Sequence, residues 1–302
     1  MPNEKKLKIA GLGETLWDIY EQEKFVGGSA TNFSVHVAQS GQDAYLFSRV
    51  GDDKNGRELL QKLSDVNVNT SGVQHDIFKP TGSLHISLDE EGNPDYHCTK
   101  DVAFDYMRLD SIWEELAPQM DAVFFGMLAQ RNDVSREAMN GFLKKATTAL
   151  KVCDLNIRQW NSNTERAVND ALVFADIVKL NQSECSILKR GLNVDTDDIS
   201  FLRQLLEKHA IRMVALTLGQ HGCYLITAKE KEFDPGYSIK PMDLSGAGDA
   251  FAAGLVLKVL QQAPLSDVAD FANKLGAYVS TKIGAVPDWS FHVLDEFITE
   301  SI

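Results

Sequence analysis

Short apolar runs alternate with amphipathic stretches along most of this sequence, and this alternation restricts the possible folds more than any other feature. The expected strands are Leu7–Leu12, Tyr45–Val50, Ala122–Phe125, Val152–Leu155, Ile177–Leu180 and Met213–Leu218. The expected helices are Ala30–Ser40, Gly56–Asp65, Ser135–Leu150, Thr164–Phe174, Ser183–Lys189 and Ile199–His209. Strands and helices in alternation build a mostly parallel sheet covered by helices on both faces. The predicted fold class is therefore α/β, with a doubly wound sheet that binds ligands beyond the C-terminal ends of its strands.

One region departs from this alternation. Between Thr81 and Thr99 the sequence TGSLHISLDEEGNPDYHCT has two alternating segments around an acidic Gly-Asn-Pro turn, which predicts a β-hairpin. Leu16–Val26 could supply another extended segment. We interpret both as a small β lid, inserted at about 14–26 and 79–105 into a single domain of residues 1–302; an ordinary surface hairpin is the alternative. Because exposed sheet edges are better protected when paired, we expect a homodimer through the lid.

Charge and cysteine content narrow the partners and the compartment. The net charge of −13 argues against nucleic-acid binding and against attraction to anionic membranes. No segment approaches the ~20 apolar residues of a membrane span, and the first residues carry no signal-peptide core. The four cysteines lie far apart without a CxxC pair, so we expect each to pack as a small apolar residue in a reduced compartment. These features predict a cytoplasmic protein.

The strongest motif is Asp243–Phe251, with the sequence DLSGAGDAF. Apolar residues from Ala247 onward recur at the i, i+4 spacing of one helix face, so a turn of small residues opens directly into a helix. The unpaired N–H groups and positive dipole end of such a helix can bind phosphate, whatever the net charge of the chain. Asp249 would lie in the first turn, where it could accept a proton from an attacking hydroxyl or merely complement the helix dipole, worth ~0.3–1 kcal/mol.

GAGDAF resembles the C-terminal signature of the ribokinase-type (PfkB) carbohydrate kinases. Gly27–Asn32, with the sequence GGSATN, resembles a second signature of that family, and the motifs follow the family's order along almost the whole chain. The resemblance implies a ribokinase-like fold and transfer of the γ-phosphate of ATP to a sugar hydroxyl, with Mg²⁺ as cofactor. It also implies that Asp249 is the catalytic base and that Gly246, Ala247 and Gly248 form an anion hole.

The sugar-binding residues expected from the resemblance are Asp18, Gly27, Gly28 and Asn32. Glycines let a substrate approach the backbone, and an asparagine offers both a donor and acceptors for sugar hydroxyls. Asp18 could accept hydrogen bonds from two neighbouring hydroxyls. The simpler alternatives are a polar residue at a helix start for Asn32 and a loop carboxylate for Asp18.

The expected nucleotide-binding residues are Asn181, Thr217, Gly219, Gly222 and Asn273. Asn181–Glu184 resembles the family's N-x-x-E motif, in which Glu184 would hold magnesium directly or through water. A capping interaction at a helix start is the alternative for this motif. Thr217–Gly222 resembles the T-x-G-x-x-G nucleotide loop, although a hairpin turn would need the same residues.

The specific sugar is predicted from Asp154–Arg158, whose sequence DLNIR looks like the D-x-N-x-R element of fructokinases and related keto-sugar acid kinases. Arg158 could steady the transferring phosphate or a substrate oxygen, because a guanidinium presents several donors in a plane; it could instead pair with a surface carboxylate. With the lid sequence, this element favours fructose as the substrate and fructose 6-phosphate as the product. The alternatives are 2-keto-3-deoxygluconate, ribose and a nucleoside.

Three further alternatives concern cofactors and function class. Leu244 stands where the family commonly has threonine, which leaves activation by a monovalent cation such as K⁺ open. A catalytically inactive sugar- or nucleotide-binding regulator would be expected to have a damaged Asp249 or phosphate loop, and both are intact here. A dinucleotide-dependent oxidoreductase would need a complete G-x-G-x-x-G turn, which Gly11–Glu14 begins but Trp17 and Asp18 do not complete.

Overall fold

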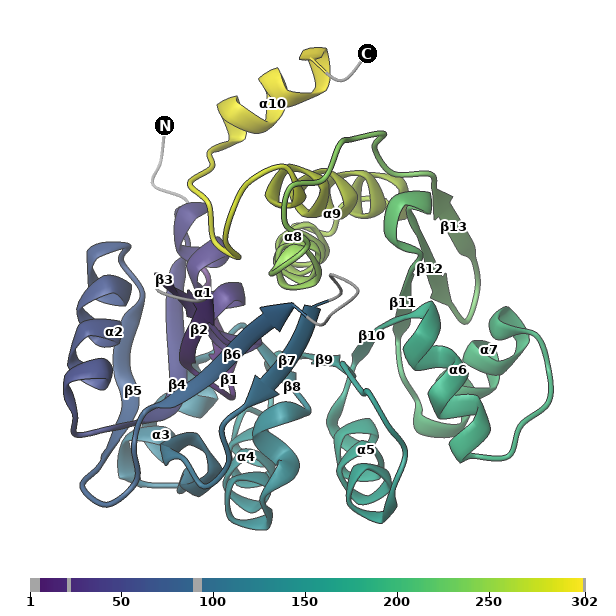
Figure 1. Ribbon diagram of the computed structural model, residues 1–302. Coiled ribbons are helices and arrows are strands. Elements are labelled where there is room, and N and C mark those ends of the chain that lie inside the picture. Colours follow the sequence, from purple (N-terminus) through teal and green to yellow (C-terminus); the bar gives the residue numbers. More distant parts are fainter. Residues whose placement is uncertain (1–5, 21–22, 89–93, 301–302) are drawn as a thin grey trace.

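The computed structural model describes residues 6–20, 23–88 and 94–300, which form two β-sheets and the helices that pack around the larger one (Figure 1). The larger sheet has the strand order β13-β12-β11-β10-β9-β8-β1-β4-β5. Its strands are β1 (Lys8–Leu12), β4 (Asp43–Gly51), β5 (Asn69–Asp76), β8 (Ala122–Gly126), β9 (Leu150–Asp154), β10 (Ile177–Asn181), β11 (Met213–Thr217), β12 (Cys223–Thr227) and β13 (Lys231–Asp234). The seven neighbouring strands β11, β10, β9, β8, β1, β4 and β5 run parallel, whereas β12 and β13 are antiparallel and lie at one edge.

Helices cover both faces of this sheet. They are α1 (Ser29–Gln39), α2 (Lys54–Asp65), α3 (Ser111–Leu116), α4 (Asp133–Lys145), α5 (Ser162–Phe174), α6 (Gln182–Gly191), α7 (Asp198–His209), α8 (Ala247–Leu260), α9 (Leu265–Ser280) and α10 (Phe291–Glu300). Helices α3 to α7 contribute to one hydrophobic core, and α1, α2 and α8 to α10 contribute to the other. This is the doubly wound α/β arrangement that the alternating sequence predicts. None of the helices in the described part of the chain is long and apolar enough to cross a bilayer.

The central strands are buried on both sides, which explains their continuous apolar sequences. Strand β8 is buried along its whole length. Successive side chains point to opposite faces, so Phe124 stacks on Phe33 of α1 in one core, with ring centroids 4.4 Å apart, while Phe125 lies in the other core. Alternation along one strand therefore links the two helical layers.

Three details differ from the sequence predictions. The helix predicted for Ser135–Leu150 ends at Lys145, because the chain leaves helical geometry at Ala146, and Leu150 begins β9. Helix α8 has no single apolar face: residues 249–257 are all buried, since the helix packs between α1 and α9. Strand β5 was not predicted, because its polar sequence NTSGVQHD lacks a strand signal.

The second, smaller sheet has the strand order β3-β2-β6-β7. Its strands are β2 (Leu16–Tyr20), β3 (Glu23–Gly27), β6 (Gly82–Leu88) and β7 (Pro94–Cys98). The hairpin predicted between Thr81 and Thr99 and the extended segment Leu16–Val26 are thus confirmed, while residues 89–93 of the hairpin turn lie outside the described residues. In the view of Figure 1, β6 and β7 pass in front of the middle of the larger sheet.

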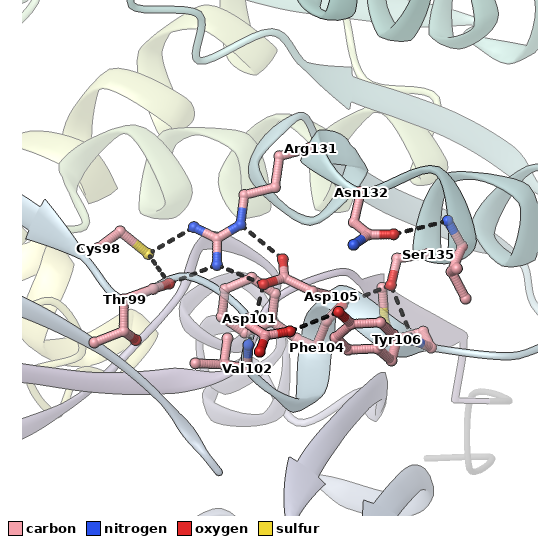
Figure 2. Close-up of polar contacts among 12 residues, drawn as sticks. Cys98, Thr99, Asp101, Val102, Phe104, Asp105, Tyr106, Arg131, Asn132 and Ser135 are labelled. Carbon is pink, nitrogen blue, oxygen red and sulfur yellow. Dashed lines mark hydrogen bonds and ion pairs between the residues drawn. The ribbon is translucent and has the colours of Figure 1, made fainter. Parts of the chain in front are cut away.

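One arginine joins the second sheet to the main body (Figure 2). Arg131, at the end of the short helix η3 (Leu128–Arg131), donates two hydrogen bonds of 2.7 and 2.8 Å to the carboxylate of Asp105. The same guanidinium donates to the Thr99 carbonyl at 2.6 Å and to Cys98 Sγ at 3.3 Å. Cys98 is half-buried and packs against one hydrophobic core, in line with the prediction for the cysteines, and its sulfur in addition accepts a hydrogen bond from Arg131.

We predict that Arg131→Ala destabilises the protein by roughly 2–3 kcal/mol, because it leaves the Asp105 carboxylate, 4% exposed, without its charged partner. The loss stays below that of a fully buried pair because the Arg131 side chain is 23% exposed. Urea unfolding measures it. The control is Arg57→Ala, which breaks an ion pair with Asp52 whose side chains are 63% and 55% exposed; this change should cost less than about 1 kcal/mol. Equal losses in the two variants would contradict the proposed anchoring.

Candidate active site

Two adjoining cavities lie at the edge of the larger sheet where the C-terminal ends of β9, β10 and β11 meet. The smaller, with a volume of about 350 Å³, is termed the polar cavity, and the larger has a volume of about 570 Å³. Lys179, Asn181, Leu244 and Gly248 line both. Ligands of doubly wound sheets bind at this end, so the location fits a ligand site.

The start of helix α8 lies on the wall between the two cavities. Gly246 is its N-cap in a left-handed conformation (φ 73°), and a Cβ there would lie 2.4 Å from the Ala285 carbonyl oxygen. No side chain caps the helix at Gly246, so its first N–H groups have no side-chain partner; the Ala247 N–H makes only a long contact of 3.4 Å with the Leu244 carbonyl oxygen. Gly246 and Gly248 line the polar cavity, and Ala247 lines the larger one. The turn that opens into a helix, predicted from DLSGAGDAF, is confirmed.

Asp249, in the first turn of α8, points into the polar cavity and is only 8% exposed. Its Oδ2 accepts a hydrogen bond of 2.9 Å from Asn32 Nδ2. Burial raises the pKa of Asp249 to about 7, and the Asp154 carboxylate adds to the rise against the opposing effect of the Asn32 hydrogen bond. A carboxylate with a pKa near neutrality is suited to accept a proton during a reaction.

Several buried oxygens in the polar cavity have no hydrogen-bond partner among the described residues. These are Glu14 Oε2, Asp18 Oδ1, Asn32 Oδ1 and Asp154 Oδ1. An unpaired buried acceptor costs about 1–3 kcal/mol, which a ligand that donates hydrogen bonds would recover. The set therefore fits a ligand that carries several hydroxyl groups.

Asp18 lies in the middle of strand β2, so its interpretation as a loop carboxylate is wrong. It is 7% exposed, and burial raises its pKa to about 7, with further contributions from the charges of Asp243 and Glu14. Gly27 packs directly against the Asp18 carboxylate, where a side chain would have no room. Gly28 lines the cavity beside Asn32. The structure thus brings the four expected sugar-binding residues together.

The expected nucleotide-binding residues all line the larger cavity. They are Asn181, Thr217, Gly219, Gly222 and Asn273. Asn273, on α9, donates a hydrogen bond of 2.6 Å to Asp234 of β13. Apolar and aromatic side chains, including Tyr237, Ile239 and Phe251, complete the walls. A cavity with apolar walls and a few polar groups is a typical cofactor site.

Asn181 and Glu184 form the capping box that was the alternative interpretation of their motif. Asn181 donates through its backbone N and its Nδ2 to the two Glu184 oxygens, and Glu184 N donates to Asn181 Oδ1. Burial and the nearby Asp154 carboxylate raise the pKa of Glu184 to about 7. Its carboxylate also lines the polar cavity, so the cap does not exclude a second function.

The oxygen-rich surroundings of Glu184 fit a hydrated magnesium ion. Asp154 has an unpartnered oxygen in the same cavity, and oxygen is the ligand that magnesium prefers. Within the described ranges, no three His, Cys, Asp or Glu side chains form a metal cluster of their own. Magnesium commonly binds through one or two carboxylates together with substrate phosphates and water, which requires no such cluster.

The remaining predicted positions lie at the mouth of the site. Arg158, on the loop after β9, is exposed and lines the polar cavity. Leu244, which is 71% exposed, lies between the two cavities.

Three charged residues that line the polar cavity had no role of their own in the sequence-based predictions: Glu14, Lys179 and Asp154, the last of which entered only as part of the DLNIR element. A lysine within the apolar strand IVKL was the clearest available signal, because a lysine is almost never buried without a partner. Glu14 and Asp154 each follow or end a buried strand, but only the folded chain places them together.

Comparison with known proteins identifies the family. The family model described as "pfkB family carbohydrate kinase" matches residues 3–290. The uncharacterized sugar kinase PH1459 of Pyrococcus horikoshii is 31% identical to this chain, covering 96% of it and 94% of the relative. A fructokinase of Vibrio alginolyticus is 29% identical, covering 87% and 88%. The structure of a Xylella fastidiosa fructokinase with bound ATP, at 22% identity, shares the fold with a TM-score of 0.86 over 97% of this chain and 98% of that one. This chain belongs to the pfkB family of carbohydrate kinases.

Proposed function

We propose that this carbohydrate kinase transfers the γ-phosphate of ATP to fructose and forms fructose 6-phosphate. The observation that carries the proposal is the position of Asp249, a buried carboxylate beside the start of α8 where the two cavities meet. The sugar would occupy the polar cavity and ATP the larger one, with its γ-phosphate directed toward the α8 N-terminus. In-line transfer requires the attacking hydroxyl and the leaving ADP to lie on opposite sides of the phosphoryl group, with the anion site between them.

In the proposed reaction, Asp249 accepts the proton of the attacking sugar hydroxyl. A bond forms between that hydroxyl oxygen and the γ-phosphorus, while the bond from phosphorus to the oxygen bridging the β- and γ-phosphates breaks and ADP leaves. The N–H groups at Gly246–Gly248 stabilise the charge on the transferring group, and Arg158 steadies it from the mouth. Magnesium, when bound near Glu184, would neutralise charge on the phosphates.

The charges of the polar cavity support a neutral sugar over 2-keto-3-deoxygluconate. Acidic side chains predominate there: Glu14, Asp18, Asp154, Glu184 and Asp249, against the basic Lys179 and Arg158. A substrate carboxylate would meet this surplus of acidic groups, whereas neutral hydroxyls can donate to the unpartnered oxygens. Fructose rather than ribose or a nucleoside is supported by the DLNIR element and by similarity to the Vibrio alginolyticus fructokinase.

We also infer that the second sheet acts as a lid over the sugar and pairs two chains into a homodimer. A lid is supported by the hydrogen bond between Tyr20 of β2 and Ser245 of the loop before α8, whose oxygens lie 3.0 Å apart. Pairing is supported by the edge positions of β3 and β7 in the small sheet.

The proposed substrate is tested by ADP release with ATP and magnesium across fructose, ribose, 2-keto-3-deoxygluconate, glucose and adenosine. We expect fructose to give a kcat/KM at least about tenfold above the others, since a site that hydrogen-bonds specific hydroxyls discriminates by that much or more. A higher kcat/KM for another compound would replace fructose and keep the mechanism.

Asp249→Asn should lower kcat by roughly 10²–10⁴-fold, the usual contribution of a general base. The matched control is Asp267→Asn, which removes an exposed acidic residue from the first turn of α9 without touching either cavity. Turnover of the control should equal that of the wild type. If both variants lose activity equally, or if folded Asp249→Asn keeps wild-type turnover, Asp249 is not the base.

The kcat/KM for the sugar should rise with pH through about 7, because Asp249 accepts a proton only when it is ionised and its pKa is about 7. Below that value, activity should fall about tenfold for each pH unit. Since the pKa values of Asp18 and Glu184 are also about 7, the profile is repeated with Asp18→Asn and with Glu184→Gln, in each of which the limb due to Asp249 should persist. A flat profile on the acidic side of neutrality would contradict the assignment.

A further inference from the structure

Lys179 lies between the two cavities, beside the groups proposed to carry out the transfer. It lies on β10, is 6% exposed and lines both cavities. Its Nζ donates a hydrogen bond of 2.8 Å to Asp154 Oδ2 at the end of β9. Removing two charges from water is costly, so a buried ion pair often adds little to the stability of the fold. The pair between Lys179 and Asp154 is therefore not explained by stability alone.

The ammonium group retains capacity to bind a ligand. An ammonium has three N–H donors, and across the described ranges the only hydrogen-bond acceptor found for Lys179 Nζ is Asp154. Burial lowers the pKa of Lys179, but the neighbouring Asp154, Glu184 and Asp249 carboxylates outweigh this effect and raise the pKa overall. Lys179 is therefore a cation at neutral pH.

The start of α8 lies directly against this ammonium. A Cβ at Gly248 would lie 2.8 Å from Lys179 Nζ, so a larger residue there would force the ammonium to shift away from the first turn of the helix. Lys179 and Gly248 each line both cavities. The fixed charge of the lysine and the positive end of the helix dipole thus converge on the wall that a phosphoryl group would cross.

We propose that Lys179 is a catalytic residue that donates hydrogen bonds to the oxygens of the transferring phosphoryl group, while Asp154 holds the ammonium in place. This inference rests on the proposed kinase reaction at the same site. Lys179 keeps its proton throughout, and Asp249 remains the group that accepts the sugar's proton. The lysine adds a full positive charge, which the N–H groups of α8 lack. Because this charge is buried, it would stabilise the negative charge of the transferring phosphoryl group more strongly than an exposed charge.

The test compares Lys179→Met, Lys179→Arg, Asp154→Asn and the double variant Lys179→Met/Asp154→Asn. The double variant removes both charges, so a folded protein can be examined even if Lys179→Met alone leaves Asp154 unpaired and unfolds the chain. We expect kcat of the double variant to fall by roughly 10²–10³-fold, with the sugar KM changed by less than about threefold. Lys179→Arg, which keeps the charge, should retain more activity than Lys179→Met.

A binding measurement separates this proposal from the proposed function. Calorimetry with magnesium and either ATP or ADP, without sugar, should show that the double variant loses roughly tenfold in its preference for ATP, since only ATP carries the γ-phosphate. If the wild type phosphorylates none of the sugars, the proposed function fails, yet this comparison still decides whether Lys179 contacts the γ-phosphate.

The control is Lys151→Met, which removes a half-buried lysine from the neighbouring strand β9, outside both cavities. It should match the wild type in kcat and in both affinities. The proposal is overturned if the folded double variant keeps wild-type kcat and an unchanged ratio of ATP to ADP affinity.

Discussion

The geometry of this site depends on one constraint, the fixed position of the α8 N-terminus. Helix α8 is buried on all sides between α1 and α9, so it cannot shift without disturbing a whole core. Its Gly246 turn packs against Ala285, whose carbonyl oxygen is 3.1 Å from Nε2 of the buried His36. Trp289 Nε1 donates to Nδ1 of the same ring, so Nε2 carries the proton and donates to Ala285. Burial lowers the His36 pKa to about 4, which keeps this support neutral.

Around that fixed point the protein concentrates acidic groups that a core alone would not tolerate. Burial raises the pKa values of Asp18, Glu184 and Asp249 to about 7, and several oxygens of the polar cavity lack a partner among the described residues. Buried polar groups without partners reduce stability, and they concentrate where a ligand completes the set. In the proposed function, these same groups would position the sugar, accept its proton and hold the metal ion, so the features that reduce stability are the ones that would bind the ligands.

The topology also decides between the function classes. Gly11 lies within β1 and Gly13 follows it, but the chain continues into β2 of the second sheet rather than into a helix. A dinucleotide site needs a helix N-terminus at that turn, so the oxidoreductase interpretation has no structural basis here. The corresponding helix N-terminus occurs at Gly246 instead, beside an intact Asp249, which is the arrangement expected of an active kinase rather than of an inactive binding protein.

The sequence by itself determined the fold class, the small sheet and the two glycine motifs, because hydrophobic periodicity and turn residues act locally. It also identified Asp249 and Asn32, whose motifs stand out in the chain although 217 positions separate them. Only the tertiary structure placed Glu14 and Lys179 in the site and paired Lys179 with Asp154 of the DLNIR element, since these features depend on burial and on contacts between strands that are distant in sequence. Local patterns specify which elements form, whereas the environment that shifts a pKa or leaves an oxygen unpaired exists only after those elements pack together.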